Sequence, residues 1–198
     1  MPKAWSKNEK ELVKNSLMEK GRRLFEKFGI QKTTVDEIVK AARISKGAFY
    51  HFYESKEEFY FEIVGVVERE FKDQVYEIAS QPGRSHRENF RKFLHKMIDA
   101  MTTTPLFRQI NSADLQYLMR KVPPNALKKH IEHDQEYFEK YFDVWIRKGW
   151  MRKVSMKALN GLLLSLVYFV VQRDDLAGMY FNASKDLLID MLAEYLIP

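Results

Sequence analysis

Cysteine is absent from the 198-residue sequence, and glycine and proline are scarce, with 8 and 6 residues. Without cysteine the chain has no disulfides, no thiolate zinc sites, no iron–sulfur clusters and no cysteine nucleophile. The low glycine and proline content, with 45% apolar and 14% aromatic residues, excludes a largely disordered chain. These values fit one or two globular domains with a packed core.

Long apolar runs are absent too. The longest covers residues 158–171 and is interrupted by Asn160 and Ser165. As a helix it would span about 21 Å, less than the roughly 30 Å hydrocarbon core of a bilayer. The first residues lead into a charged segment, which does not fit a secretory signal. We therefore expect a soluble, cytoplasmic protein with no membrane partner.

Sequence signatures of catalysis are also missing. The chain has no G-x-S-x-G nucleophile motif and no glycine-rich phosphate loop. His130 and His133, with Asp134 beside them, have a spacing that can chelate a metal, but no second cluster of ligands accompanies them. We expect no metal, no cofactor and no enzymatic activity.

Positive charge is concentrated at one end of the chain. The net charge is +6, and residues 1–60 contribute +4 of it, from 13 Lys and Arg against 9 Asp and Glu. A concentrated positive end is the expected footprint of polyanion binding, and it equally fits a solvated surface.

Apolar residues recur at steps of three and four throughout, with no alternation of period two, so we predict an all-α fold of about nine helices. Four Ser/Thr residues are followed three positions later by Glu, which is typical of helix starts. These pairs are Ser6/Glu9, Thr34/Glu37, Ser55/Glu58 and Ser85/Glu88. The predicted helices cover 7–28, 35–42, 46–52, 55–80, 85–101, 106–122, 124–148, 156–173 and 184–196.

Two short predicted helices, 34–42 and 45–52, are separated by about three residues. In this arrangement one helix supports another that lies in the DNA major groove. Gly47 and Ala48 let the backbone of the second helix come close to DNA, and Ser45, Lys46 and Tyr50 offer donors on its exposed side, as does the next residue, His51.

The segment 34–59 resembles the DNA-binding domain of TetR-family transcriptional repressors, and the resemblance extends over about residues 8–65. Three runs carry it: Thr34-Val35-Asp36-Glu37-Ile38, Ile44-Ser45-Lys46-Gly47-Ala48-Phe49-Tyr50-His51-Phe52 and Ser55-Lys56-Glu57-Glu58-Phe59. The resemblance implies a three-helix helix-turn-helix domain followed by a helical bundle that binds an effector and dimerises. By the same resemblance, Thr34 and Lys56 contact phosphate, and the recognition helix faces DNA.

Arg43 departs from the family pattern, which usually has glycine at the end of the first short helix. A non-glycine residue in a left-handed turn costs on the order of 1 kcal/mol, so the turn is either adjusted or the cost is tolerated. An arginine at this position could also reach a phosphate.

The residues that we expect at the DNA are Thr34, Arg43, Ser45, Lys46, Gly47, Ala48, Tyr50, His51 and Lys56. Taken singly, some of them have ordinary alternatives: Tyr50 as a core residue, His51 as a surface or half-buried histidine and Lys56 as a solvated helix cap. Four lysines near the N-terminus recur at helical spacing: Lys3, Lys7, Lys10 and Lys14. This lysine stripe could follow the phosphate backbone or form a solvated face paired with Glu9 and Glu11.

One recognition helix reads too few bases for useful specificity, so we expect a homodimer on two half-sites. The helix 156–173 is apolar nearly all round and needs cover on two sides, from its own core and from a partner. The alternative is a central helix of a monomer. The resemblance implies that the last two helices of each subunit form the interface, with Leu163, Val167, Val170, Leu188, Met191, Leu192 and Tyr195 as the expected residues.

Aromatic residues gather on two of the middle helices. They are suited to an apolar effector pocket, as the resemblance implies, although each one singly also fits ordinary core. Asp134 lies on an apolar stripe, where it either pairs with a lysine or histidine or faces a cationic effector. The expected pocket residues are Phe90, Phe93, Met97, Asp134, Phe138, Tyr141, Phe142 and Trp145.

Together these features predict a dimeric, sequence-specific DNA-binding repressor that a small molecule releases from a palindromic operator. We expect the DNA-binding domain at residues 8–65, with its helix-turn-helix at about 34–53, and the effector and dimerisation domain at 66–198. The alternative is a helical small-molecule carrier or interaction module with incidental DNA affinity.

Overall fold

The computed structural model describes residues 6–79, 85–174 and 178–198, and the side chains of 73–79, 134, 178 and 179 lie outside the described part. Within these ranges the chain is all α-helical, as predicted, and has no strand. Its ten α-helices are α1 (Lys7–Lys32), α2 (Val35–Ala42), α3 (Lys46–Phe52), α4 (Lys56–Ala79), α5 (His86–Thr103), α6 (Pro105–Arg108), α7 (Ser112–Lys121), α8 (Pro124–Arg147), α9 (Met156–Val171) and α10 (Gly178–Leu196).

The helix count differs from the prediction because the stretch 106–122 forms two helices. Asn111 and Asp114 make a reciprocal capping box that starts α7 four residues after α6 ends. Such a box satisfies amides that a new helix leaves without partners, so it permits the break. Of the described helices, none has the length and apolar character that a membrane span requires.

Three of the four predicted capping pairs form complete capping boxes, at Ser6, Thr34 and Ser85. At the fourth, the Ser55 hydroxyl accepts a hydrogen bond from the Glu58 amide at 3.0 Å, but the Glu58 carboxylate accepts from the amide of Glu54. These caps fix the starts of α1, α2, α4 and α5, each contributing roughly 1 kcal/mol.

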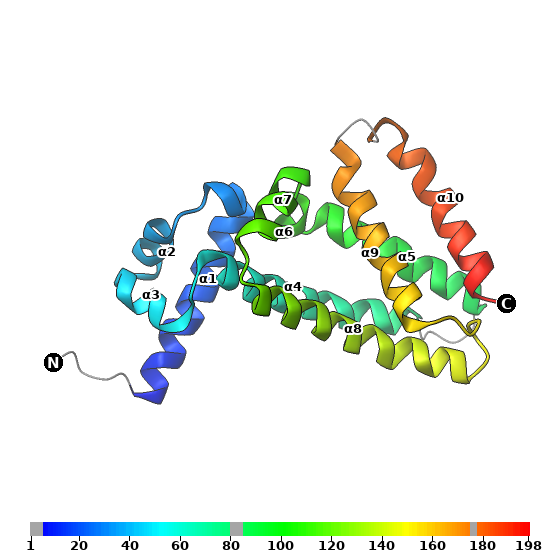
Figure 1. Cartoon of the computed structure of the whole chain (residues 1–198), viewed down its shortest axis with the longest axis horizontal. Helices are drawn as coiled ribbons and strands as arrows, with labels where there is room; N and C mark the ends of the chain where they lie inside the picture. Colours follow the sequence, from blue (N-terminus) through cyan, green and yellow to red (C-terminus); the bar gives the residue numbers. More distant parts are fainter. Residues whose placement is uncertain (1–5, 80–84, 175–177) are drawn as a thin grey trace.

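Figure 1 shows α1, α2 and α3 at one end of the molecule, α9 and α10 at the other, and the long helix α4 running between them beside α8. The described residues form two apolar cores. One unites α1 to α4 with parts of α6 and α7, and the other unites α5, α8, α9 and α10. Because α4 starts at the turn after α3 and reaches the second core, it connects the two ends.

Candidate nucleic-acid interface and interior cavities

The turn between α2 and α3 is left-handed at Arg43, with φ 57° and ψ 43°. The Ile44 amide donates to the carbonyl oxygen of Val39 at 3.0 Å, and the Arg43 amide donates to that of Lys40 at 3.3 Å. The chain therefore keeps the turn geometry that usually calls for glycine and tolerates the cost of a side chain there. The Arg43 side chain is exposed.

The orientation of α3 is fixed by Phe49, which is fully buried. Its ring packs edge-on against Phe59 of α4, with centroids 5.5 Å apart, and lies 5.6 Å from the ring of Tyr53. The start of the helix is capped by Ser45, whose hydroxyl accepts from the Ala48 amide at 3.1 Å. Burial of one face leaves the opposite face of α3 in solvent.

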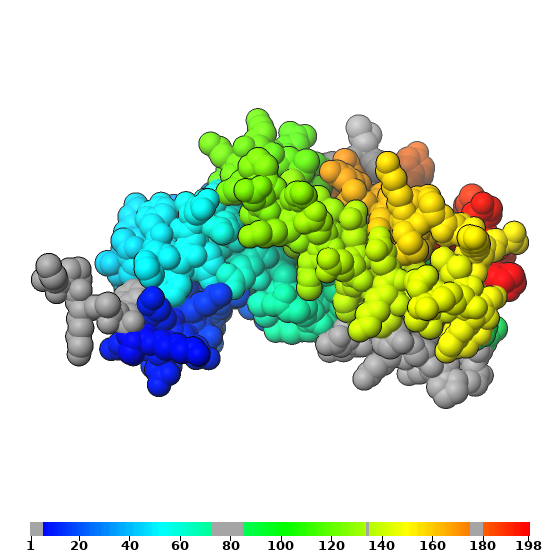
Figure 2. Space-filling view, turned by 60° about the horizontal axis from the view of Figure 1, so that its bottom comes forward, coloured from blue at the N-terminus to red at the C-terminus, as the bar shows by residue number. Residues whose placement is uncertain are grey.

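That exposed face carries most of the residues predicted to contact DNA. Ser45, Lys46, Gly47, Tyr50 and His51 are exposed, as are Thr34 at the start of α2 and Arg43. Tyr50 is 51% exposed, although a tyrosine at a helical apolar position often packs into a core. Ala48 is half-buried. The segment containing α2 and α3 forms the cyan surface at one end of the molecule in Figure 2.

Gly47 has no neighbour that requires a glycine. A β-carbon built there would meet nothing closer than the Ser45 hydroxyl, at 3.9 Å. Space within the chain therefore does not explain this glycine, whereas close approach of the backbone to an external surface would.

Lys46 already has a partner on α2. Its ammonium lies 3.0 Å from the carboxylate of Asp36, which raises the pKa of Lys46. Both side chains are largely exposed, so the pair is weak and can open toward a phosphate or a base.

Lys56 does not lie as the sequence predicts. Its ammonium points into the chain and donates to the carbonyl oxygens of Ile30 at 2.6 Å and Thr33 at 2.8 Å. Because α1 ends at this point, these carbonyls lack helical partners and attract the nearest cation. Burial also lowers the pKa of Lys56. The predicted phosphate contact is therefore replaced, in this conformation, by a contact that joins α1 to α4.

The predicted lysine stripe on α1 is divided in the structure. Lys3 lies outside the described residues, Lys7 and Lys10 are exposed, and Lys14 forms a 2.7 Å ion pair with Glu62 of α4. Glu9 closes the Ser6 capping box. The phosphate contact of this stripe stays a prediction for Lys7 and Lys10.

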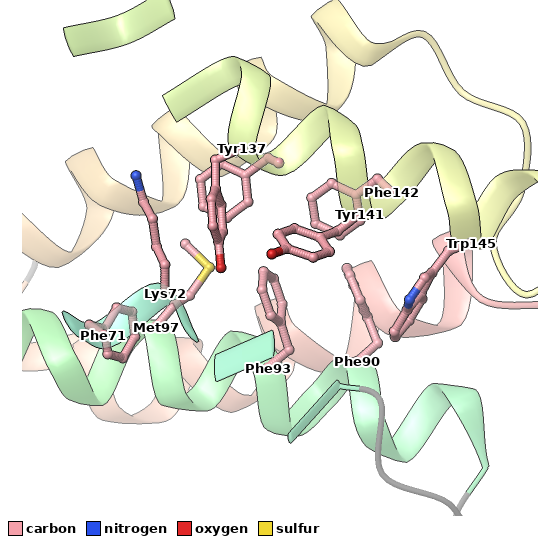
Figure 3. Close-up of a pocket in the computed structure, with 10 residues that line it drawn as sticks. Phe71, Lys72, Phe90, Phe93, Met97, Tyr137, Tyr141, Phe142 and Trp145 are labelled. Atoms are coloured by element: carbon pink, nitrogen blue, oxygen red, sulfur yellow. The ribbon is translucent and has the colours of Figure 1, made fainter. Parts of the chain in front are cut away.

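An aromatic cavity lies between α4, α5 and α8 (Figure 3), and seven of the eight predicted pocket residues line it. The eighth, Asp134, belongs to α8, and its side chain lies outside the described residues. Phe71, Lys72 and Tyr137 also line this cavity and were not among the residues predicted from the sequence. Lys72 follows Glu68 by four residues, a spacing that reads as a solvated ion pair until the tertiary structure buries it. The cavity holds only about 30 Å³.

A second cavity of about 210 Å³ adjoins the first, and we call it the junction cavity because α4, α5, α7, α8 and α9 all contribute to it. Phe71, Lys72, Met97 and Phe138 line both cavities. His130, considered above for metal binding, lies in its wall 3.6 Å from Glu68. Within the described ranges, no three His, Asp or Glu side chains gather as metal ligands would.

Helices α6 and α7 bind the N-terminal core to the rest of the chain. Gln31 donates to the buried carboxylate of Asp114 at 2.8 Å, and the Tyr117 hydroxyl donates to Glu57. On the other side, the Arg173 guanidinium donates to the Arg108 carbonyl oxygen at 2.6 Å. These bonds connect α6 and α7 to α1 and α4 on one side and to the segment Gln172–Asp174, which follows α9, on the other.

The predicted dimer residues fall into two groups, and the first must be corrected. Leu163 and Val170 are buried in the chain's own core, so they do not face a partner. Because α9 is apolar nearly all round, its sequence does not reveal which side faces inward. Val167, Leu188 and Leu192 are half-buried. Met191 and Tyr195 are 59% and 63% exposed, and α9 and α10 also expose Leu162, Leu164, Tyr168, Tyr180 and Leu187.

Comparison with known proteins places these features in a family. Residues 17–63 match the family model described as bacterial regulatory proteins, tetR family. The chain is 22% identical over 163 residues to the HTH-type transcriptional regulator QacR of Staphylococcus aureus, covering 76% of this chain and 84% of QacR. It is 31% identical over 93 residues to the uncharacterized HTH-type transcriptional regulator YhgD of Bacillus subtilis, covering 47% of this chain and about half, 48%, of YhgD.

The fold comparison extends over the whole chain. A TetR-family transcriptional regulator from Pectobacterium atrosepticum superposes with a TM-score of 0.74 at 20% identity, covering 98% of this chain and 99% of that one. The matched sequence segment contains α2, α3 and their turn, and the helical body follows the same architecture. Residues 17–63 therefore form a helix-turn-helix domain of the TetR family, and the whole chain has the fold of TetR-family transcriptional regulators. Regulators of this family bind DNA and are not enzymes.

Proposed function

We propose that the chain is a dimeric repressor that binds a palindromic operator through α3 and leaves it when a small molecule enters the interior cavities. The observation that carries the proposal is the course of α4, which begins directly after the exposed recognition face and supplies Phe71 and Lys72 to both cavities. One rigid helix thus connects the two sites.

On the DNA side, the exposed residues of α3 would enter the major groove. Lys46, Tyr50 and His51 would reach base edges or phosphates, with Gly47 and Ala48 allowing close approach. Thr34 and Arg43 would contact the backbone from α2 and its turn. Lys56 would act indirectly, by holding the end of α1 against the start of α4.

A second copy would supply the second recognition helix. Helices α9 and α10 expose seven large apolar side chains to solvent: Leu162, Leu164, Tyr168, Tyr180, Leu187, Met191 and Tyr195. Their exposure on two successive helices supports a self-complementary contact. Sedimentation at micromolar concentration should give a dimer, and replacing both Met191 and Tyr195 with Glu should give a monomer. Asn182→Glu, an exposed polar position on α10, is the matched control.

The release mechanism would be a shift between two conformations. A ligand that binds better to the form with mis-spaced recognition helices lowers operator affinity, whereas one with equal affinity for both forms changes nothing. The contacts of α6 and α7 with α1, α4 and the 3-10 helix Gln172–Asp174, which follows α9, support this coupling. We place the boundary between the DNA-binding domain and the effector domain at about residue 65, within α4.

The regulatory direction is tested in a reporter strain. Genomic fragments that the purified chain retains are placed upstream of a reporter gene, with and without the chain expressed. A repressor lowers reporter output, and Tyr50→Ala restores it. A rise in output would identify an activator, and retention of fragments without any shared sequence would favour the small-molecule carrier instead.

A further inference from the structure

A charged side chain lies almost completely buried at the wall that the two cavities share. Lys72 of α4 is 6% exposed. Its ammonium lies 5.2 Å from the centre of the Tyr137 ring and 5.7 Å from that of Phe138, and 3.8 Å from the Glu68 carboxylate. A buried ammonium is costly unless its charge is balanced, and the Glu68 carboxylate supplies a balancing charge here.

Phe138 lies in the wall of both the small aromatic cavity and the junction cavity. Its ring stacks on Phe142 at 6.0 Å and meets Phe93 edge-on at 6.4 Å. Lys72 and Met97 also line both cavities. Displacement of the Phe138 side chain would bring about 30 Å³ and about 210 Å³ together in one site nearer the size of a small-molecule pocket, with Lys72 in its wall.

The charges decide which ligand such a site favours. The Lys72 ammonium lies over one face of the Tyr137 ring and one face of the Phe138 ring, where it would repel a cationic ligand. A carboxylate would instead be attracted, because the ammonium has three donors and can bind it alongside Glu68. Glu68 also lies 3.6 Å from His130, which offers its carboxylate a second partner as the ligand arrives.

We propose that the effector is an apolar aromatic carboxylate whose acid group pairs with Lys72 and whose ring occupies the aromatic cavity after Phe138 moves. This inference rests on the proposed function for its regulatory meaning, but the binding preference itself is a property of the cavity. Figure 3 shows the ammonium of Lys72 beside Tyr137, at one end of the row of rings.

Three probes with the same ring and different charge test the proposal: 2-naphthoate, 2-naphthylmethanol and 2-naphthylmethylammonium. Titration calorimetry on the full chain should show the carboxylate binding about tenfold or more tighter than the alcohol, with the ammonium compound weakest. Lys72→Met should remove the preference for the carboxylate, and Lys72→Arg should retain it because the charge is kept.

Lys128→Met is the matched control. Like Lys72, Lys128 pairs with a glutamate four residues away on the same helix, but Lys128 and Glu132 lie on the exposed surface. Removing the Lys128 charge should therefore leave the preference for the carboxylate intact. The helical signal in circular dichroism checks that each variant folds. If Lys72→Met does not fold, the Lys72→Arg variant still tests whether the preference depends on the charge.

Three results would overturn the inference: equal or tighter binding of the alcohol or the ammonium probe, a carboxylate preference that survives Lys72→Met, or no saturable binding of 2-naphthoate at about 1 mM. DNA selection tests the proposed function separately. If the chain binds a palindromic operator but shows no carboxylate preference, only this inference is contradicted. If the chain shows the preference but no sequence-specific DNA binding, only the proposed function as a regulator is contradicted.

Discussion

The ammonium of Lys56 donates a hydrogen bond to the carbonyl oxygen of Ile30 at 2.6 Å, which joins the start of α4 to the end of α1. A second bond runs to Thr33, and the ring of Tyr117 lies 5.5 Å away. This lysine therefore ties the end of the long N-terminal helix to the start of the helix that leads to the cavities.

Replacing Lys56 with Met should destabilise the chain, because two carbonyl oxygens at the end of α1 lose a charged donor. Allowing for partial solvent exposure, we expect a loss of roughly 1–3 kcal/mol in the free energy of unfolding. Urea denaturation measures it. Lys40→Met, at an exposed lysine of α2, is the control, and an equal effect of both changes would argue against the role given to Lys56.

Replacing Arg43 with Gly should stabilise the chain by about 0.5–1 kcal/mol, because glycine adopts φ 57° without steric cost. Arg43→Ala keeps the strained backbone and should give no such gain. If the guanidinium contacts phosphate, both variants should weaken DNA binding equally. A gain in stability from alanine would show that the arginine side chain, and not the backbone, is the source of strain.

Gly21 lies where α1 crosses α4, and a β-carbon there would come within 2.4 Å of the buried Phe59 ring. Gly21→Ala should therefore cost about 1–3 kcal/mol in unfolding free energy. Gly65→Ala on α4 is the matched control, because its β-carbon would meet only the end of Arg69, at 3.6 Å, and helix propensity favours alanine. Similar denaturation midpoints for the two variants would contradict the packing described.

Alkaline pH should destabilise the chain. Burial raises the pKa of Tyr53, Tyr60 and Tyr117 above 10, so the unfolded chain releases these protons first. Their stabilising contribution is complete below about pH 10 and is lost as the pH rises further, by at most about 1.4 kcal/mol per pH unit for the buried Tyr60. The titration of Lys56 changes the stability in the opposite direction as the pH rises, because burial lowers the pKa of this lysine.

Urea midpoints between pH 9 and 11 measure this effect, and Tyr60→Phe should flatten the decline while leaving a stable fold at pH 7. A midpoint that stays constant or rises over this range would show that the buried tyrosines do not control alkaline stability.

Much of the fold follows from local signals in the sequence. The Ser/Thr caps and Gly149, at φ 72°, mark helix ends through short-range chemistry, so their positions were predictable. The aromatic cavity was predictable because its rings recur at helical spacing on α5 and α8. Each of these signals lies within a few residues along the chain.

What the sequence did not reveal depends on contacts between distant segments. Lys56 and Lys72 look alike as surface lysines near glutamates, yet one bonds to carbonyls of α1 and the other is buried among rings of α8. Leu163 and Met191 are both apolar, and only packing decides that the first is buried and the second exposed. Period alone cannot assign faces on helices that are apolar nearly all round.

Selection of DNA from a random-sequence pool by the purified chain tests the central claim most directly. The account predicts a recovered palindrome whose half-sites are centred about 34–36 Å apart, one helical turn, or a multiple of it. Tyr50→Ala and Lys46→Ala should each weaken binding to it roughly 5- to 100-fold, while the exposed Lys40→Ala changes it little. Recovery of no shared motif, or unchanged affinity in both variants, would contradict the account.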